Sequence, residues 1–220
     1  MFIDFHTHSD RQDPELLNLQ TLHVTPELSS EELPTFCSLG LHPWFVEEKS
    51  WAESWANLEL LGRSPQVIAI GECGLDRLIP LSLEVQITIF QKQIELAEVL
   101  QKPLVIHCVR AFAELIELKK KTKPSVPWII HGFNKKSEVL QQLLRHDFYF
   151  SFGAAILSDR SPLHQAIATI PDGKFLLETD DRHDLSVKQI YERVASLRQV
   201  SLTTLQAQLL ETYYQLTRLS

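Results

Sequence analysis

The stretch Val67-Ile68-Ala69-Ile70-Gly71-Glu72 is an apolar run that stops at a carboxylate. A short apolar run without polar alternation is typical of a strand buried on both faces, as in parallel sheets. Similar runs recur along the chain, and from about residue 66 helical patterns separate them. This alternation predicts a parallel α/β fold.

Eight strands and seven helices are predicted from these patterns. The strand candidates are residues 2–6, 20–24, 36–41, 67–71, 103–107, 127–131, 148–153 and 174–179. The helix candidates are residues 50–61, 82–101, 110–121, 136–146, 161–169, 187–198 and 202–218. The first three strands lie close together, so we expect only single helical turns around 13–18 and 29–33. The predicted fold is a distorted, compact (β/α)8 TIM barrel with shortened early helices, smaller than the roughly 250 residues typical of that fold.

The longest helix candidate, residues 82–101, carries an apolar stripe at helical spacing. Its members are Leu83, Ile87, Phe90, Ile94, Ala97 and Leu100. Because these positions share one face of a helix, we expect that face to be buried. Pro103 ends the helix.

Length and composition indicate one domain over residues 1–220. The hydrophobic fraction is 44% and the charged fraction is 22%, both ordinary for a globular protein. No apolar run approaches the roughly 20 residues that span a bilayer, and no signal-peptide pattern is found. Three cysteines without zinc-ribbon spacing, Cys37, Cys73 and Cys108, favour reduced thiols in a cytoplasmic protein. We expect them to be small core residues rather than metal ligands.

The charge balance argues against a large nucleic-acid footprint. The chain has 28 acidic and 21 basic residues, which gives a formal net charge of −7. Proteins that bind duplexes normally present a basic face. Local basic runs occur at Lys119-Lys120-Lys121, Lys123 and Lys135-Lys136, where a solvated helix face is the simpler interpretation.

Ionisable side chains fall where the predicted strands end. The members of this set are His6, His8, His42, Glu72, His107, His131 and Asp180. The C-terminal ends of all strands in a barrel face one mouth, so these side chains are expected to converge there. Imidazole and carboxylate groups together bind borderline divalent cations. The pattern therefore predicts a metal-dependent hydrolase with two metal ions at the C-terminal mouth.

Each predicted metal ligand has an expected role. In His6-Thr7-His8 both imidazoles leave the chain on the same side and suit one cation. Glu72 is the carboxylate placed to bridge two cations, while His107 and His131 suit the second one. Asp180 can bind the first cation and contact the attacking water, which makes it the catalytic candidate.

Three further residues are expected at the same mouth. Arg110, three residues after His107, suits a phosphate oxygen of the substrate, although a surface arginine at a helix N-terminus fits the pattern equally well. His42 is expected to contact substrate or to support a ligand. Asp76 either orients a ligand histidine through its free ring nitrogen or caps a turn. Surface positions are the default expectation for the remaining histidines, His23, His146, His164 and His183, but His183 belongs to the loop Asp180-Asp181-Arg182-His183 that is expected over the mouth.

Several segments carry a family resemblance. The opening Ile3-Asp4-Phe5-His6-Thr7-His8-Ser9 resembles both the PHP phosphoesterases and the TatD-type metal-dependent hydrolases. The segments that resemble the TatD type are Gly40-Leu41-His42-Pro43, Gly71-Glu72-Cys73-Gly74-Leu75-Asp76, Phe90-x-x-Gln93-x-x-x-Ala97, Pro103-Leu104-Val105-Ile106-His107 with Arg110-Ala111, Ile130-His131-Gly132-Phe133 and Leu177-Glu178-Thr179-Asp180. Their order is preserved from residue 1 to about residue 218, so the whole chain is similar to TatD-related deoxyribonucleases.

The resemblance implies a distorted TIM barrel with divalent metal ions (Zn, Mn, Mg or Fe) and phosphodiesterase or deoxyribonuclease activity on single-stranded DNA ends or short oligonucleotides. It assigns metal binding to His6, His8, Glu72, His107, His131 and Asp180. The chain departs from the family pattern at His131-Gly132-Phe133-Asn134-Lys135 and at Asp181-Arg182-His183. These departures leave the ligands intact and change the segments expected to face substrate.

Three alternatives stay open. A small-molecule phosphatase of the PHP type would need additional ligands for a third metal. A urease-like amidohydrolase usually has a bridging modified lysine where this chain has Glu72. A non-catalytic metal-binding or partner-docking barrel would keep the ligands, but Asp180 argues against it because a structural zinc needs four ligands and no open position.

Overall fold

The computed structural model describes residues 1–10, 13–48 and 50–218. In these residues the strands are β1 (Phe2–Thr7), β2 (Leu16–His23), β3 (Cys37–Gly40), β4 (Val67–Asp76), β5 (Leu104–Val109), β6 (Trp128–Ile130), β7 (Tyr149–Phe152) and β8 (Phe175–Leu177). The helices are α1 (Trp51–Leu61), α2 (Leu83–Leu100), α3 (Phe112–Thr122), α4 (Ser137–Leu144), α5 (Leu163–Thr169), α6 (Val187–Arg198) and α7 (Leu202–Thr217), with short 3₁₀ helices η1 (Ser30–Glu32) and η2 (Ala154–Leu157). None of the helices in this part of the chain is long and apolar enough to cross a bilayer.

The strands follow one another in chain order, from β1 to β8, in a parallel sheet. β1 also lies beside the segment after β8, where Thr7 and Asp180 form a parallel bridge. From β3 onward, at least one α-helix lies in each connection between strands. In the connection from β7 to β8, the short helix η2 precedes α5. A parallel sheet whose first and last strands are neighbours has the strand order of a (β/α)8 barrel, so the predicted fold class is confirmed.

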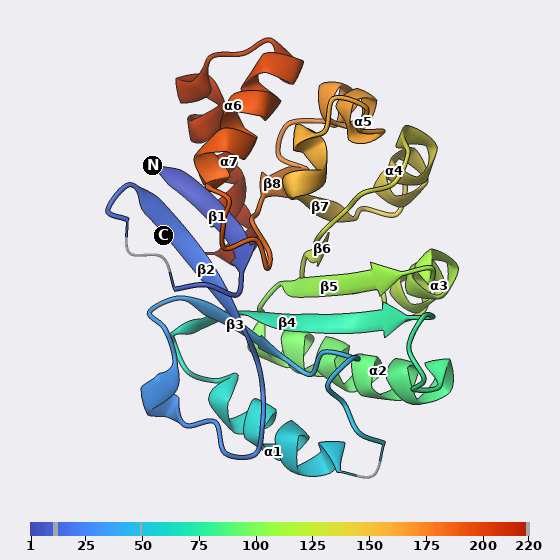
Figure 1. The fold of residues 1–220 in the computed structure, drawn as a ribbon. Coiled ribbons are helices and arrows are strands. Elements are labelled where there is room, and N and C mark those ends of the chain that lie inside the picture. Colours follow the sequence, from blue (N-terminus) through green and yellow to red (C-terminus); the bar gives the residue numbers. More distant parts are fainter. Residues whose placement is uncertain (11–12, 49, 219–220) are drawn as a thin grey trace. The chain divides into compact units, whose positions relative to one another are not determined.

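Contacts between residues group the chain into two compact units. Unit 1 comprises Met1–Gln20 and Ile130–Ser220, and unit 2 comprises Thr21–Ile129. In unit 1, α6 and α7 pack on β1 and β8. In unit 2, α2 packs along β4, which lies between β3 and β5 (Figure 1). The single domain expected over residues 1–220 stays a prediction.

The start of β2 differs from the sequence-based expectation. β2 begins at Leu16 rather than at residue 20, so the helical turn predicted around 13–18 is wrong. The parallel register with β1 begins at the pair Phe2 and Leu16, and the longer strand supplies backbone hydrogen-bond partners along β1. The other predicted turn, around 29–33, is confirmed as η1.

The buried face of α2 differs in part from the predicted apolar stripe. Phe90, Ile94 and Ala97 are buried as expected, whereas the other three members of the stripe are only half-buried. Two glutamines take part in the buried face instead, since Gln86 and Gln93 are 2% and 1% exposed. Both amides find backbone partners, and a buried polar group is stable when it is hydrogen-bonded.

Candidate metal centre

The predicted ligands lie at the C-terminal parts of the strands, although not always beyond them. β1 ends between His6 and His8, and His131 follows β6. β4 and β5 extend further than predicted. Glu72, expected just after its strand, and His107, expected as the last residue of its strand, therefore both lie inside their strands. The longer strands extend the backbone pairing on both sides of these two side chains.

An irregularity in β4 accommodates Glu72. The register with β5 shifts between Ile70 and Cys73, so Gly71 and Glu72 together oppose one residue of β5, as in a β-bulge. Gly71 and Gly74 have φ angles of 132° and 137°, and a Cβ atom at these positions would lie 2.2 Å and 2.1 Å from carbonyl oxygens of β5. Because only glycine permits this approach, the two glycines are required for the position of Glu72.

In unit 1, imidazoles gather around one carboxylate. The Nε2 atoms of His6 and His8 lie 3.6 Å and 3.5 Å from Oδ1 of Asp180, and the His6 ring stacks on the His131 ring at 4.0 Å. His6 is fully buried, whereas the side chains of His8 and Asp180 are 38% and 37% exposed. The sets His6-His8-Asp180 and His131-Glu178-Asp180 each bring three donor atoms within 4.8 Å of one another. Nitrogen and carboxylate donors that converge at a solvent-accessible point fit a catalytic divalent cation.

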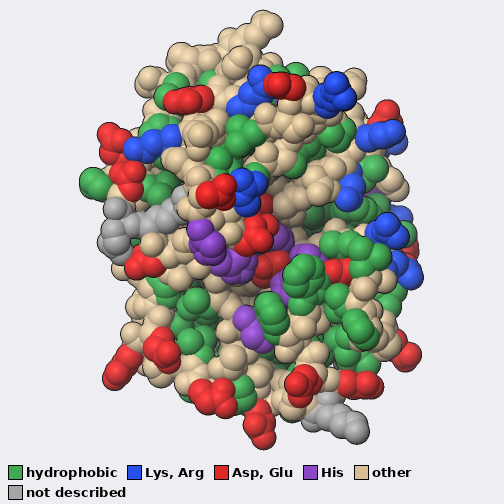
Figure 2. Space-filling view, viewed as in Figure 1, with side chains coloured by type: hydrophobic (Ala, Val, Ile, Leu, Met, Phe, Trp, Pro, Cys, Tyr) green, Lys and Arg blue, Asp and Glu red, His purple; other side chains and the backbone are tan. Residues whose placement is uncertain are grey.

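Histidine and acidic side chains are also seen side by side on the surface in Figure 2. The carboxylate of Asp180 is held in its charged form. Burial alone would raise its pKa, but the interactions with His6 and His8 and the charge of His131 outweigh burial, so the pKa lies far below its ordinary value. The Asp180 backbone N–H donates to the His6 carbonyl at 2.9 Å, which fixes the residue against β1. An ionised carboxylate can bind a cation or accept a proton.

Two buried carboxylates that the sequence analysis did not single out support this group. Asp4 accepts hydrogen bonds from the backbone N–H and the hydroxyl of Thr179, at 2.8 Å and 2.6 Å, and so anchors the segment after β8. Glu178 Oε1 accepts the Gly132 N–H at 2.6 Å and lies 3.6 Å from His131 Nδ1. Among the described residues, Glu178 Oε2 is buried and has no hydrogen-bond partner. Glu178 is therefore a further candidate metal ligand. A carboxylate embedded in an apolar strand run is the signal that would have found both.

A cleft in unit 1 adjoins Asp180. It has a volume of about 260 Å³ and is lined by residues from the segments 132–134, 153–155 and 178–182. Two of these segments contain the departures from the family pattern, so both departures line the same cleft. Arg182 is held there by Asp184 through two hydrogen bonds of 2.8 Å.

In unit 2, His42, Glu72 and His107 form another group. His42 Nε2 lies 2.9 Å from Glu72 Oε1, and His107 Nδ1 lies 3.2 Å from the same oxygen. All three side chains are largely buried, with exposed fractions of 7%, 8% and 12%. Three donor atoms of this set also lie within 4.8 Å of one another. His42, expected to contact substrate or support a ligand, thus lies as close to Glu72 as the predicted ligand His107 does.

Asp76 contacts the second nitrogen of His107. Its Oδ2 atom lies 3.2 Å from His107 Nε2 and accepts the indole N–H of Trp44 at 2.7 Å. Burial raises the pKa of Asp76, but hydrogen bonds from Trp44, the Leu78 backbone and His107 lower it below its ordinary value. A carboxylate on the second ring nitrogen fixes the tautomer and the orientation of a histidine.

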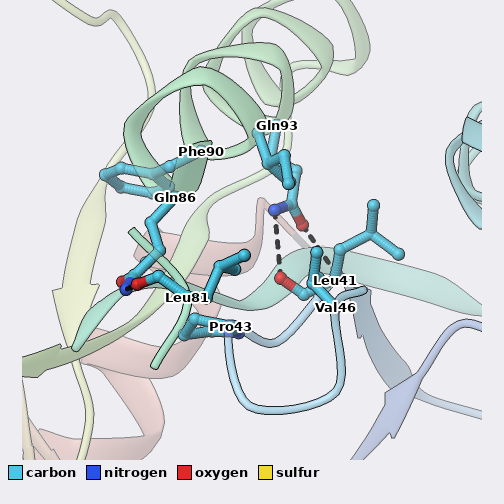
Figure 3. A pocket seen from close by; sticks show the side chains of 9 residues that line it. Leu41, Pro43, Val46, Leu81, Gln86, Phe90 and Gln93 are labelled. Carbon is cyan, nitrogen blue, oxygen red and sulfur yellow. Dashed lines mark hydrogen bonds between the residues drawn. The ribbon is translucent and has the colours of Figure 1, made fainter. Parts of the chain in front are cut away.

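Helix α2 holds the backbone on both sides of this group. Gln93 Oε1 accepts the Leu41 N–H at 2.8 Å, and Gln93 Nε2 donates to the Leu41 carbonyl at 3.2 Å (Figure 3). Gln86 makes the same pair of bonds with the backbone of Asp76, at 2.7 Å and 2.9 Å. Leu41 directly precedes His42, so the two glutamines anchor the segments that carry His42 and Asp76. Both glutamines also line a small cavity (Figure 3).

Two other predicted positions can be compared with the structure. His23 was expected at the surface, but it ends β2, is half-buried and accepts the His42 N–H at 3.2 Å, so that prediction is wrong. Burial, assisted by the charge of His42 and opposed by that of Glu72, lowers the pKa of His23 to about 4. Arg110 follows β5, is exposed and has a φ angle of 53°.

The cysteines are free thiols. Cys37 and Cys73 are buried and Cys108 is half-buried. Burial raises the pKa of Cys37 to about 12 and that of Cys73 well above its ordinary value, which disfavours the thiolate form that binds metal. In the described part of the chain, none of the possible metal-binding groups includes a cysteine.

The fold and these donor groups define a class of protein, the α/β barrels with histidine–carboxylate metal-binding groups. Within that class, the chain matches the model of the TatD related DNase family over residues 13–218. The chain therefore belongs to the TatD-related DNase family, as the motif resemblance predicted.

Several relatives have names that describe an activity. The 3'-5' ssDNA/RNA exonuclease TatD of Edwardsiella piscicida is 34% identical over 168 residues, which cover 73% of this chain and 62% of that protein. The human 3'-5' RNA nuclease TATDN2 is 34% identical over 178 residues, which cover 78% of this chain and 23% of that protein. The uncharacterized metal-dependent hydrolase YabD of Bacillus subtilis is 28% identical, with 76% of this chain and 71% of that protein covered. The matches thus span less than two thirds of the length of these two nucleases.

Solved structures share the fold. YJJV, a TatD homolog from Escherichia coli K12, gives a TM-score of 0.83 at 22% identity and covers 100% of this chain and 98% of its own. A TatD family hydrolase from Entamoeba histolytica gives a TM-score of 0.79 at 16% identity, with 98% and 97% covered. These similarities support the same barrel fold for the chain.

Proposed function

We propose that this chain is a divalent-metal-dependent phosphodiesterase that acts on single-stranded nucleic acid. The observation that carries the proposal is the presence of two histidine–carboxylate groups, His6-His8-Asp180 in unit 1 and His42-Glu72-His107 in unit 2, in a member of the TatD-related DNase family. The names of two relatives, an exonuclease of ssDNA and RNA and an RNA nuclease, support the same reaction class.

The proposed ligands are His6, His8, Glu72, His107, His131 and Asp180, for up to two divalent cations. Mixed imidazole and carboxylate donors suit Zn, Mn or Fe, whereas Mg normally prefers oxygen ligands and waters. In this proposal Glu72 would contribute its carboxylate to the binding of both cations. Bound cations would polarise the phosphoryl group and lower the pKa of a coordinated water.

The chain's own residues supply proton transfer and positioning. In this proposal Asp180, whose side chain is 37% exposed, orients the attacking water and takes up its proton. Asp76, 3.2 Å from His107 Nε2, holds the imidazole in the orientation that binds a cation through the other nitrogen. Arg110, exposed after β5, binds a phosphate oxygen of the substrate in this proposal.

A short single-stranded substrate fits the charge of the chain. With a net charge of −7, the protein has no excess of cations to neutralise many phosphates at once. We therefore propose DNA or RNA ends and short oligonucleotides as substrates, in preference to intact duplexes. We also propose a cytoplasmic location, since Cys37, Cys73 and Cys108 are free thiols.

A panel of substrates tests the proposal. The purified chain is assayed on a bis-aryl phosphodiester, a phosphomonoester, a lactone, and labelled single-stranded and duplex oligonucleotides, with Mn, Mg or Zn added in turn. We expect metal-dependent cleavage of the phosphodiester and of the single-stranded oligonucleotide. Turnover of the lactone without any phosphoester cleavage would contradict the proposal and favour an amidohydrolase-type enzyme.

A further inference from the structure

Two adjacent aromatic side chains remain open to solvent after His42. Trp44 and Phe45 follow Pro43 in the loop after β3, and they are 59% and 61% exposed. Large apolar side chains are usually buried because exposure of their surface is unfavourable. In the visible face of Figure 2, hydrophobic side chains lie beside histidine side chains. An exposed aromatic pair beside the candidate metal-binding histidines suggests a surface that binds a ligand.

Both rings contact the histidines of the unit 2 group. The Trp44 ring lies 5.3 Å from the His42 ring and 5.6 Å from the His107 ring, both in edge-to-face geometry. The Phe45 ring lies 5.4 Å from the His42 ring and 5.1 Å from the His23 ring. The exposed pair is therefore directly adjacent to the side chains that contact Glu72.

The indole is held in one orientation while more than half of its surface stays accessible. Its Nε1 donates to Asp76 Oδ2 at 2.7 Å, and Asp76 is only 2% exposed. The Trp44 backbone N–H donates to His42 Nδ1 at 3.1 Å, and the Phe45 N–H donates to the His42 carbonyl at 3.1 Å. A ring that is fixed before binding loses little conformational entropy when a ligand stacks on it.

We propose that Trp44 and Phe45 form a stacking platform for a nucleobase of the substrate strand, next to the phosphodiester that is cleaved. This inference rests on the proposed function and names how that site recognises its substrate. Stacking on aromatic side chains is independent of base identity, because every base has a π face. It also supplies affinity without positive charge, which a chain with a net charge of −7 needs for an anionic ligand.

The test compares oligonucleotides with and without bases. Two labelled single-stranded pentamers carry the same phosphates, and one has every base replaced by an abasic tetrahydrofuran residue. The variants are Trp44→Ala, Phe45→Ala and Trp44→Phe, and the matched control is Leu60→Ala, an exposed position of α1 in the same unit at 69% exposure. For wild-type protein we expect KM to be about tenfold lower for the pentamer that has bases.

Phe45→Ala should raise KM for the pentamer with bases about tenfold and leave KM for the abasic pentamer unchanged. Its kcat should stay within about threefold, since the phenyl ring meets His42 and His23 only through ring contacts and acts through the base. Trp44→Ala should show the same base-dependent rise in KM, together with a lower kcat on both pentamers because Asp76 loses the indole N–H. Trp44→Phe should recover part of the loss in KM because a ring is restored. Leu60→Ala should match wild type on both pentamers.

Trp44 also contacts Asp76, so a purely structural role has a different signature. If Trp44 acts only by orienting Asp76 and His107, Trp44→Ala and Trp44→Phe lower kcat equally on both pentamers and Phe45→Ala has no effect; that result overturns the platform. Fluorescence anisotropy of the same labelled pentamers in EDTA tests the platform without turnover. Base-dependent binding that Phe45→Ala abolishes supports the platform even if no cleavage is found, whereas equal or absent binding of the two pentamers overturns it even if the phosphodiesterase activity stands.

Discussion

Asp180 combines partial exposure with a carboxylate that two neighbouring histidines hold in its ionised form. Its Oδ1 lies within 3.6 Å of both His6 Nε2 and His8 Nε2, and its pKa is far below the ordinary value. An amide at this position keeps the size and the backbone bridge to Thr7 but cannot take up a proton. A substitution of Asp180 can therefore separate its role as a metal ligand from its role as a proton acceptor.

We expect Asp180→Asn to lower kcat by about 100-fold or more while the fold and most of the bound metal are kept, because general-base catalysis contributes on that order. Steady-state kinetics and elemental analysis check the two halves of the expectation. The control is Glu192→Gln, an exposed carboxylate of α6 that lies outside the cleft and whose loss of charge should change kcat little. A loss of only a few-fold at Asp180 would assign the proton to another group.

Glu72 is the proposed carboxylate shared by two cations. Glu72→Ala should therefore remove both ions, not one, and elemental analysis of the purified protein should show the loss. Glu95→Ala, which removes an exposed carboxylate from α2, should leave the metal content unchanged. An unchanged count in Glu72→Ala would show that Glu72 is not a ligand.

His23 makes the stability of the protein depend on pH. Its pKa is about 4 in the folded protein against 6.5 ordinarily, so below pH 6.5 the unfolded chain takes up a proton that the folded chain refuses. The free energy of unfolding should be fully retained above about pH 6.5 and should fall between about 6.5 and 4, by on the order of 2 kcal/mol for a partly accessible group. Urea unfolding at several pH values, with His23→Asn as the comparison, measures this contribution. Parallel pH curves for the two proteins would contradict the expectation.

Helix α2 holds two backbone segments at once, because its two buried glutamines are seven residues apart and lie on the same face. Each amide satisfies one N–H and one C=O of a backbone segment, at Leu41 and at Asp76. These segments adjoin His42 and contact His107, so the helix connects packing to the geometry of the unit 2 group. Each buried glutamine in this apolar helix face thus positions a backbone segment of the unit 2 group.

Gln93→Leu should lower the free energy of unfolding by about 2–4 kcal/mol, because the N–H and C=O of Leu41 lose their buried partner. Chemical denaturation measures the loss, and kcat should fall with it because His42 follows Leu41. The matched control is Gln91→Leu, the same substitution at a half-buried position of α2. Equal stability of the two variants would show that the Gln93 amide is dispensable.

The net charge of −7 makes a prediction for the molecule as a whole. A protein that neutralises six to ten phosphates loses about 10³–10⁵ in affinity between 50 and 200 mM salt. With a small phosphate contact, we expect kcat/KM on a single-stranded oligonucleotide to fall less than about tenfold over that range. A steep decline would reveal a basic contact surface that the composition does not show.

The barrel could be predicted from local patterns. Apolar runs and helical stripes depend on residues near one another in the chain, and the rule that parallel strands present their C-terminal ends at one side needs no knowledge of side-chain partners. The same reasoning selected six candidate ligands. The structure brings His6, His8 and Asp180 together in unit 1, and Glu72 and His107 together in unit 2.

The supporting residues could not be predicted, because each depends on a partner far away in the sequence. Asp4 is paired with Thr179, and Gln93 with Leu41, across separations of 175 and 52 residues. The start of β2, the half-buried His23 and the carboxylate of Glu178 likewise depend on what lies opposite them. A buried polar group costs free energy unless a partner satisfies it, so its position becomes intelligible only when the folded chain shows that partner.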